Sequence, residues 1–156
     1  MSVRGMALAL PALFALHVAE EAPQFVTWFN ARVMPQISHD SFAAVNAAAM
    51  LITLGVAALL FGSHEAVPAL LGAAWVGLLM LANAVFHLVA TLAEGRYCPG
   101  VVTGTFLYLP FSAVFISKAA REARLPFLAV LAAALAGGLP MGVHGYLIVF
   151  RGSRLF

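Results

Sequence analysis

Two short patterns in the sequence place side chains that could bind a metal or move protons. His17 is followed three and four residues later by Glu20 and Glu21, so all three side chains can point from one face of a helix. Asn83 and His87 are also four residues apart. Imidazole and carboxylate groups together form the ligand set of catalytic zinc sites, and the same set suits iron or manganese. The sequence therefore predicts a bound divalent metal ion, with zinc as the first candidate.

The surrounding sequence is too apolar for a water-soluble domain. Of the 156 residues, 63% are hydrophobic and 9% are charged, whereas soluble domains have about 45–50% apolar and about 25% charged residues. The net charge of +2 is too small and too scattered for a nucleic-acid surface. The single cysteine excludes an internal disulfide and a cysteine-based zinc cluster. These features indicate an all-α integral membrane protein.

A membrane-spanning helix needs roughly 20 apolar residues, so a chain of this length has room for about five. We expect one polytopic membrane domain over residues 1–156, with a short interfacial helix after the first span, where Trp28 and its neighbours mix aromatic and polar groups. Five spans put the two termini on opposite sides. Lys and Arg number four on each side, so their distribution does not decide the orientation. The expected spans are about 3–21, 41–61, 66–93, 100–117 and 125–150.

Polar residues of all five expected spans lie towards one side of the membrane. A charged group at a helix centre costs about 2.5–3.5 kcal/mol, so such groups usually face one another or a water-filled cavity. We therefore expect a polar cavity in one leaflet, while the opposite half of each span is almost entirely apolar. The residues at this depth are His17, Glu20, Glu21, Asn46, Asn83, His87, Tyr97, Thr103 and His144.

Each of these groups also has an ordinary structural interpretation. Glu20 and Glu21 suit a solvated helix end, and a single histidine such as His87 is more often hydrogen-bonded packing than a ligand. Asn46 and Asn83 could form interhelical hydrogen bonds worth about 0.6 kcal/mol each. The common depth of all these groups favours the functional interpretation.

Three short motifs follow one another on the hydrophobic helices. They are His17-Val18-Ala19-Glu20-Glu21 (H-x-x-E-E), Asn83-Ala84-Val85-Phe86-His87 (N-x-x-x-H) and Tyr97-Cys98-Pro99-Gly100-Val101-Val102-Thr103 (Y-x-P-G-x-x-T). In this order and spacing the motifs resemble the HXXEE domain family of small bacterial and archaeal membrane proteins, and the resemblance covers about residues 17 to 103. It implies a protein of the bacterial or archaeal cytoplasmic membrane, an integral-membrane metal-dependent hydrolase, and functional roles for the motif positions His17, Glu20, Glu21, Asn83, His87, Tyr97 and Thr103.

The leading hypothesis is a membrane-embedded metal-dependent hydrolase that acts on a lipid-like or amphipathic substrate. His17, Glu21 and His87 are the expected metal ligands, and Glu20 is the expected general base. His144 is added as a ligand from its depth alone. The residue types leave open which of Glu20 and Glu21 is the ligand, since both lie on the face of His17.

Supporting roles are expected for the remaining polar positions and the Pro-Gly turn. Asn83 and Tyr97 would orient the substrate or stabilise an oxyanion. Thr103 would cap the fourth span or hydrogen-bond Glu20. Asn46 and the Pro99-Gly100 pair are assigned as supporting residues.

Two further hypotheses use the same residues. In a metal-free isomerase or cyclase of an isoprenoid or lipid, two neighbouring carboxylates would divide acid and base roles, because like charges separate their pKa values. A protein that binds or transports a metal or proton is the other alternative, although the polar groups occupy one leaflet only. The expected partners are membrane lipid and a second copy of the chain, which would pack through the Gly100-x-x-x-Gly104 or Gly138-x-x-x-Gly142 face. No nucleic acid is expected.

Overall fold

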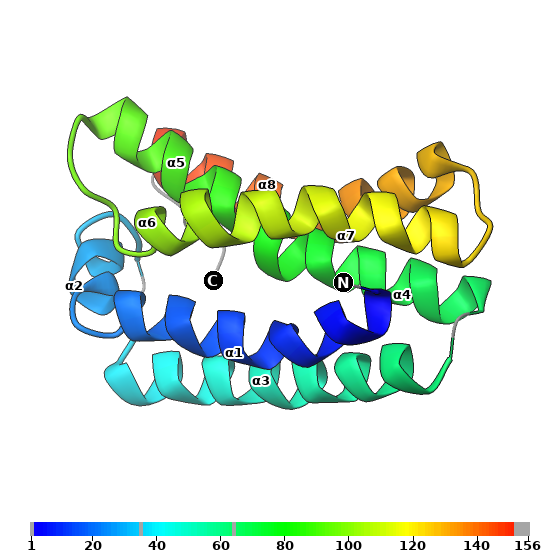
Figure 1. Cartoon of the computed structure of the whole chain (residues 1–156). Helices are drawn as coiled ribbons and strands as arrows, with labels where there is room; N and C mark the ends of the chain where they lie inside the picture. Colours follow the sequence, from blue (N-terminus) through cyan, green and yellow to red (C-terminus); the bar gives the residue numbers. More distant parts are fainter. Residues whose placement is uncertain (1, 35, 64, 152–156) are drawn as a thin grey trace.

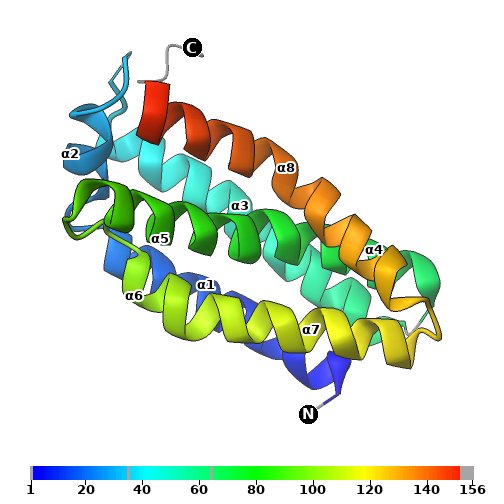
Figure 2. The same cartoon turned by 90° about the horizontal axis from the view of Figure 1, so that it is seen from above.

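The computed structural model describes residues 2–34, 36–63 and 65–151. Within these ranges, five helices are long and apolar enough to cross a membrane, and they pack side by side (Figure 1). Figure 2 shows the start of the first and the end of the last at opposite ends of the bundle. The predicted all-α integral membrane fold is confirmed. The spans are α1 (Val3–Glu21), α3 (His39–Gly62), α4 to α5 (Ala66–Glu94), α6 to α7 (Val101–Glu122) and α8 (Phe127–Arg151).

The short helix predicted after the first span is present as α2 (Phe25–Asn30). The side chain of Asn30 closes the loop that follows it, because its Nδ2 donates to the carbonyl of Ile37 and its Oδ1 accepts from the amide of Ile37, both at 2.8 Å. Arg32 joins the same loop to the end of α5, where its Nε donates to Oε1 of Glu94 at 2.6 Å. These contacts hold α2 over one end of the bundle.

The third and fourth spans each contain a π-helical stretch. Such stretches add a residue to a helical turn and occur frequently at functional sites. Both begin at a glycine, and both lie next to polar residues singled out from the sequence. The third span runs as α4 (Ala66–Val76), the π-helical Gly77–Ala82 and α5 (Asn83–Glu94), and the fourth runs as α6 (Val101–Thr103), the π-helical Gly104–Tyr108 and α7 (Leu109–Glu122).

The backbones of α8 and the third span lie in direct contact. A Cβ on Gly77 would lie 1.9 Å from the carbonyl oxygen of Ala134, and a Cβ on Gly137 would lie 2.1 Å from that of Ala74. Only glycine permits such an approach, as at other close transmembrane helix contacts. These glycines therefore set the distance between α8 and its neighbour.

The two Gly-x-x-x-Gly motifs pack mainly within the chain. A Cβ on Gly104 would lie 3.2 Å from Cα of Ala84, and one on Gly138 would lie 2.9 Å from the carbonyl oxygen of Gly77. Gly142 has no atom within 4 Å of the corresponding position. The motifs thus serve close intrachain packing, and a homo-oligomer through them stays a prediction.

The fourth span ends later than predicted. Helix α7 continues to Glu122 rather than ending at Ser117, because Lys118 and the other charged residues here are good helix formers. The Glu122 carboxylate accepts the backbone N–H of Val3 at 3.0 and 3.1 Å. This contact caps the start of α1 and joins it to the end of α7.

The apolar core lies in the half of the bundle where α1 begins and α7 ends. Met6, Leu10, Phe115 and Val130 are among its buried side chains. Large apolar side chains also cover the outside of the bundle; Leu128, for example, is 75% exposed. Such exposure is unusual for a soluble protein and is expected where helices face lipid.

Candidate metal centre

His17, Glu21 and His87 form a buried cluster where the end of α1 meets α5. Nε2 of His87 lies 3.1 Å from Oε1 of Glu21, and Nε2 of His17 lies 3.5 Å from the same oxygen. One ligand atom from each residue lies within 4.8 Å of the other two. The structure therefore brings together three of the four side chains expected to bind metal, and His144 is not among them.

The hydrogen bonds of Thr103 assign the proton of His17 to Nδ1. The hydroxyl of Thr103 donates to Oε2 of Glu20 at 2.5 Å, and an ionised carboxylate can only accept. Because a hydroxyl has one proton, Oγ1 of Thr103 must accept from Nδ1 of His17, 2.7 Å away. The Nε2 atom of His17 is left with its lone pair directed towards Glu21.

A second network assigns the proton of His87 in the same way. Burial raises the pKa of the Cys98 thiol to about 12, so the thiol keeps its proton. It donates to the carbonyl of Pro99 at 3.8 Å, and its sulfur accepts from Nδ1 of His87 at 3.3 Å. The Nε2 lone pair of His87 therefore also faces Glu21.

Three electron-rich atoms thus converge without a proton donor between them. The two Nε2 atoms are buried, and neither makes a hydrogen bond of acceptable geometry. Buried polar atoms without a partner are uncommon and costly. A divalent cation between them would satisfy all three atoms, and two imidazoles with one carboxylate match the three protein ligands of a catalytic zinc site. The residues present therefore fit the metal that the sequence predicts.

Gly100 forms one wall of the cluster. Its φ of +98° lies in the region that favours glycine. A Cβ at this position would lie 2.7 Å from Cε1 of His87 and 2.9 Å from Cε1 of His17. Glycine therefore lets the loop before α6 lie directly against both imidazole rings.

Glu20, the other carboxylate of the H-x-x-E-E motif, faces the loop before α6 instead of the cluster. Because it accepts hydrogen bonds from the first amides of α6, it caps that helix, whose dipole favours an anion there. Its donors are the amides of Gly100 (3.1 Å), Val102 (3.0 Å) and Thr103 (2.7 Å), the Thr103 hydroxyl and the Tyr97 hydroxyl (2.8 Å). These contacts favour a positioning role for Glu20 over the general-base role that we expected, and they leave Glu21 as the ligand candidate.

Tyr97 lies at the edge of the site, where its side chain is 48% exposed. Its partial burial and its hydrogen bond to Glu20 raise the pKa of the phenol to about 12. Tyr97 is therefore a neutral donor near neutral pH. The structure connects it to the cluster through Glu20 and Thr103.

The structure leaves three of the predicted residues outside the cluster of metal-ligating atoms. The ring of His144 lies 6.4 Å from the ring of Phe29, and His144 is not part of the group formed by the described residues His17, Glu21 and His87. Asn46 donates to the carbonyl of residue 42 on its own helix at 2.9 Å. Asn83 lies one turn before His87, and its buried Oδ1 has no hydrogen-bond partner.

Sequence reasoning missed Tyr108, which contacts the cluster directly. Its ring lies 4.4 Å from the ring of His17, centre to centre, and its fully buried hydroxyl has no hydrogen-bond partner. Thr103 and Tyr108 both contact His17 although they are five residues apart, a spacing that an α-helix places on different faces. The intervening π-helical turn brings them together, and the sequence carries no clear signal for that turn.

Comparison with known proteins places the chain in a family. The family model described as "Protein of unknown function with HXXEE motif" matches residues 8–115. That range includes His17, Glu21, His87 and the loop around Gly100. No curated protein and no solved structure matches the chain.

Proposed function

The chain belongs to the HXXEE family, and from that premise we propose that it is a membrane-embedded metal-dependent hydrolase. The observation that carries the proposal is the convergence of two imidazole lone pairs and one carboxylate in a buried site. Zinc is the first candidate for the metal, with iron or manganese as the other candidates.

The residues of the chain would hold and orient the metal. His17, Glu21 and His87 would supply three ligand atoms, the number that catalytic zinc sites take from the protein. When bound, a zinc ion supplies a Lewis acid and lowers the pKa of water to about 7. Thr103 keeps Nε2 of His17 free of a proton, and Cys98 does the same for His87.

The depth of the site supports a lipid-like or amphipathic substrate. His87 lies seven residues before the end of α5 at Glu94, which is roughly 10 Å at 1.5 Å per residue. With the end of α5 taken as the membrane surface, this depth corresponds to the boundary between headgroups and acyl chains. Asn83 and Tyr97 remain our candidates for orienting the substrate. We place the protein in a bacterial or archaeal cytoplasmic membrane, as its resemblance to the family implies.

Metal content tests the proposal. Protein purified in detergent without a His-tag would be measured by inductively coupled plasma mass spectrometry as wild type, H17A, H87A and H39A. His39 is exposed at the start of α3 and serves as the matched control. We expect about one equivalent of metal in wild type and H39A, and its loss from H17A and H87A while circular dichroism stays unchanged.

Absence of metal from wild type, even after reconstitution with zinc, iron or manganese, would overturn the proposal. The metal-free hypothesis would then take its place, in which Glu20 and Glu21 divide the acid and base roles on an isoprenoid or lipid. Because Glu20 caps α6, the two histidines beside Glu21 are further candidates for one of these roles. A chelator separates the two directly, because only the metal-dependent reaction stops when the metal is removed.

A further inference from the structure

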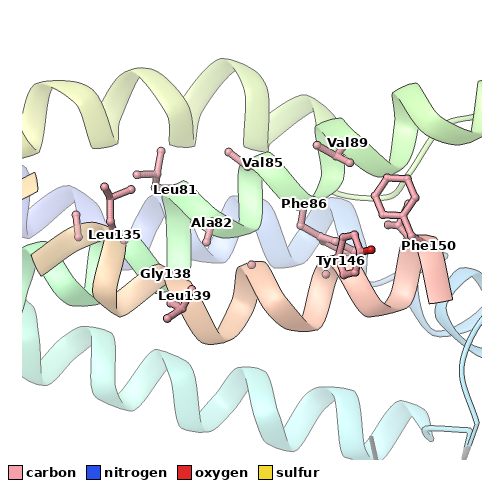
Figure 3. Close-up of a pocket in the computed structure, with 15 residues that line it drawn as sticks. Leu81, Ala82, Val85, Phe86, Val89, Leu135, Gly138, Leu139, Tyr146 and Phe150 are labelled. Atoms are coloured by element: carbon pink, nitrogen blue, oxygen red, sulfur yellow. The ribbon is translucent and has the colours of Figure 1, made fainter. Parts of the chain in front are cut away.

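An apolar groove runs between α5 and α8 on the outside of the bundle (Figure 3). This α5–α8 groove has a volume of about 390 Å³. Along α8 it extends from Ala134 to Phe150, and its other side is formed by residues of the third span. Nearly all the surface that lines it is apolar. Its residues include Leu81, Val85, Phe86, Leu139, Gly142 and Tyr146.

The dimensions of the α5–α8 groove fit one hydrocarbon chain. Sixteen positions separate Ala134 from Phe150 along α8, which gives the groove a length of about 24 Å. A helix with its side chains is about 10–12 Å across, far too wide to enter. Gly138 and Gly142 contribute no side chain to the α8 wall, which leaves space for the groove.

Phe86 joins the α5–α8 groove to the His17–Glu21–His87 cluster. Its ring lines the groove on one side, and on the other its centre lies 4.9 Å from that of the His87 imidazole. A Cβ on Gly145 of α8 would lie 2.8 Å from the Phe86 ring, so α8 holds that ring tightly. The groove and the cluster thus lie on either side of one aromatic side chain.

We propose that the α5–α8 groove binds one hydrocarbon chain of the substrate, whose polar end reaches the cluster beside Phe86. The inference rests on the function proposed above and narrows its substrate class to lipids with a long acyl or isoprenoid chain. In Figure 3 Leu135 lies at one end of the groove and Phe150 at the other, and Phe86 lies in the half nearer Phe150, so the longer part of the groove runs from the level of Phe86 towards the opposite side of the membrane. A bound chain would therefore lie as it does in the bilayer, with its polar end near the membrane surface.

Photo-crosslinking tests this placement. The protein would be reconstituted in phosphatidylglycerol vesicles containing a phosphatidylglycerol with a diazirine on one acyl chain, and labelled residues would be mapped by mass spectrometry. We expect several-fold more label on Leu139 in the groove than on Leu51 of α3, although Leu51 is 71% exposed and Leu139 64%. Equal labelling of the two would overturn the proposal, and this comparison needs no variant.

A pair of matched variants adds a second test. No atom lies within 4 Å of a Cβ at Gly142 in the groove or at Gly55 on the exposed face of α3, so G142L and G55L both have room for the added side chain. We expect G142L to lower groove labelling several-fold and G55L to leave it unchanged. Unchanged labelling in G142L that is folded by circular dichroism would contradict the proposal.

Metal analysis of the same samples separates failure of this inference from failure of the proposed function. Groove labelling in a protein without metal would leave the chain site standing and overturn the metal-dependent reaction. Metal bound to the cluster together with equal labelling of Leu139 and Leu51 would overturn the chain site and leave the metal-dependent reaction standing. We expect both signals in wild type, and we expect G142L to lose only the groove labelling.

Discussion

Replacing Thr103 tests whether its hydroxyl prepares His17 to bind metal. In T103V the hydroxyl that accepts from Nδ1 of His17 at 2.7 Å is replaced by a methyl group of similar size. The matched T103S variant keeps the hydroxyl and loses only the methyl group. Any difference between the two variants therefore reports on the hydrogen bonds of Thr103.

The expected effect of T103V is a 10–100-fold loss of zinc affinity, because groups that orient a ligating histidine typically contribute this much. That loss corresponds to about 1.4–2.7 kcal/mol. The mechanism is specific: without Oγ1, the Nδ1–H of His17 has no acceptor, and the ring is free to move its proton to Nε2, where it would block the metal. The 2.5 Å hydrogen bond from Thr103 to Glu20 is lost as well.

Zinc affinity would be measured in detergent by competition with a fluorescent chelator, for wild type, T103V and T103S. We expect T103S to bind within a few-fold of wild type. If T103V bound zinc as tightly as T103S, with unchanged helix content, the assignment of the His17 proton through Thr103 would be refuted. Weak binding by both variants would point to packing by the Thr103 methyl group instead.

Three further predictions concern the same site. E21Q should lose at least tenfold in zinc affinity in the chelator assay, because a neutral amide replaces the carboxylate between the two imidazoles; wild-type affinity would exclude Glu21 as a ligand. G100A should lower the thermal midpoint of unfolding, because the left-handed backbone at this position costs an alanine about 1–2 kcal/mol. It should also abolish metal binding, because the alanine Cβ would lie 2.7 Å from the His87 ring. The control G95A also changes a glycine of positive φ, but no atom lies within 4 Å of its Cβ, so this variant should keep its metal. Cys98 should resist maleimide at pH 8 in the folded protein, because it is buried and its pKa is raised to about 12, and it should react after denaturation; rapid labelling of the native protein would contradict that placement.

The membrane fold could be read from the sequence because it depends on local composition. Apolar runs of about 20 residues become spans wherever they occur, and the predicted ranges match the five helices closely. The exception is the end of the fourth span, where a helix of charged residues continues to Glu122. Hydropathy detects the edge of the apolar region and carries no information about how far a helix continues into water.

The candidate ligands were also within reach of sequence reasoning. The spacing of His17 and Glu21 on one helix, and the common depth of His87 on another, are local properties of α-helices. Depth alone was insufficient for His144, because residues at one level can still face different sides of the bundle. The structure places its ring beside Phe29, outside the cluster of His17, Glu21 and His87.

Only the tertiary structure separated the two carboxylates of the motif. Glu20 and Glu21 lie on neighbouring faces of α1, and their difference arises entirely from what packs against each: the amides of the loop before α6 for Glu20 and the imidazoles for Glu21. The contact of Tyr108 with His17 depends on a π-helical turn. The hydrogen bond of Cys98 to His87 depends on a loop between two spans. Such contacts join residues distant in sequence, so their geometry is set by the packing of the whole bundle and by no local pattern.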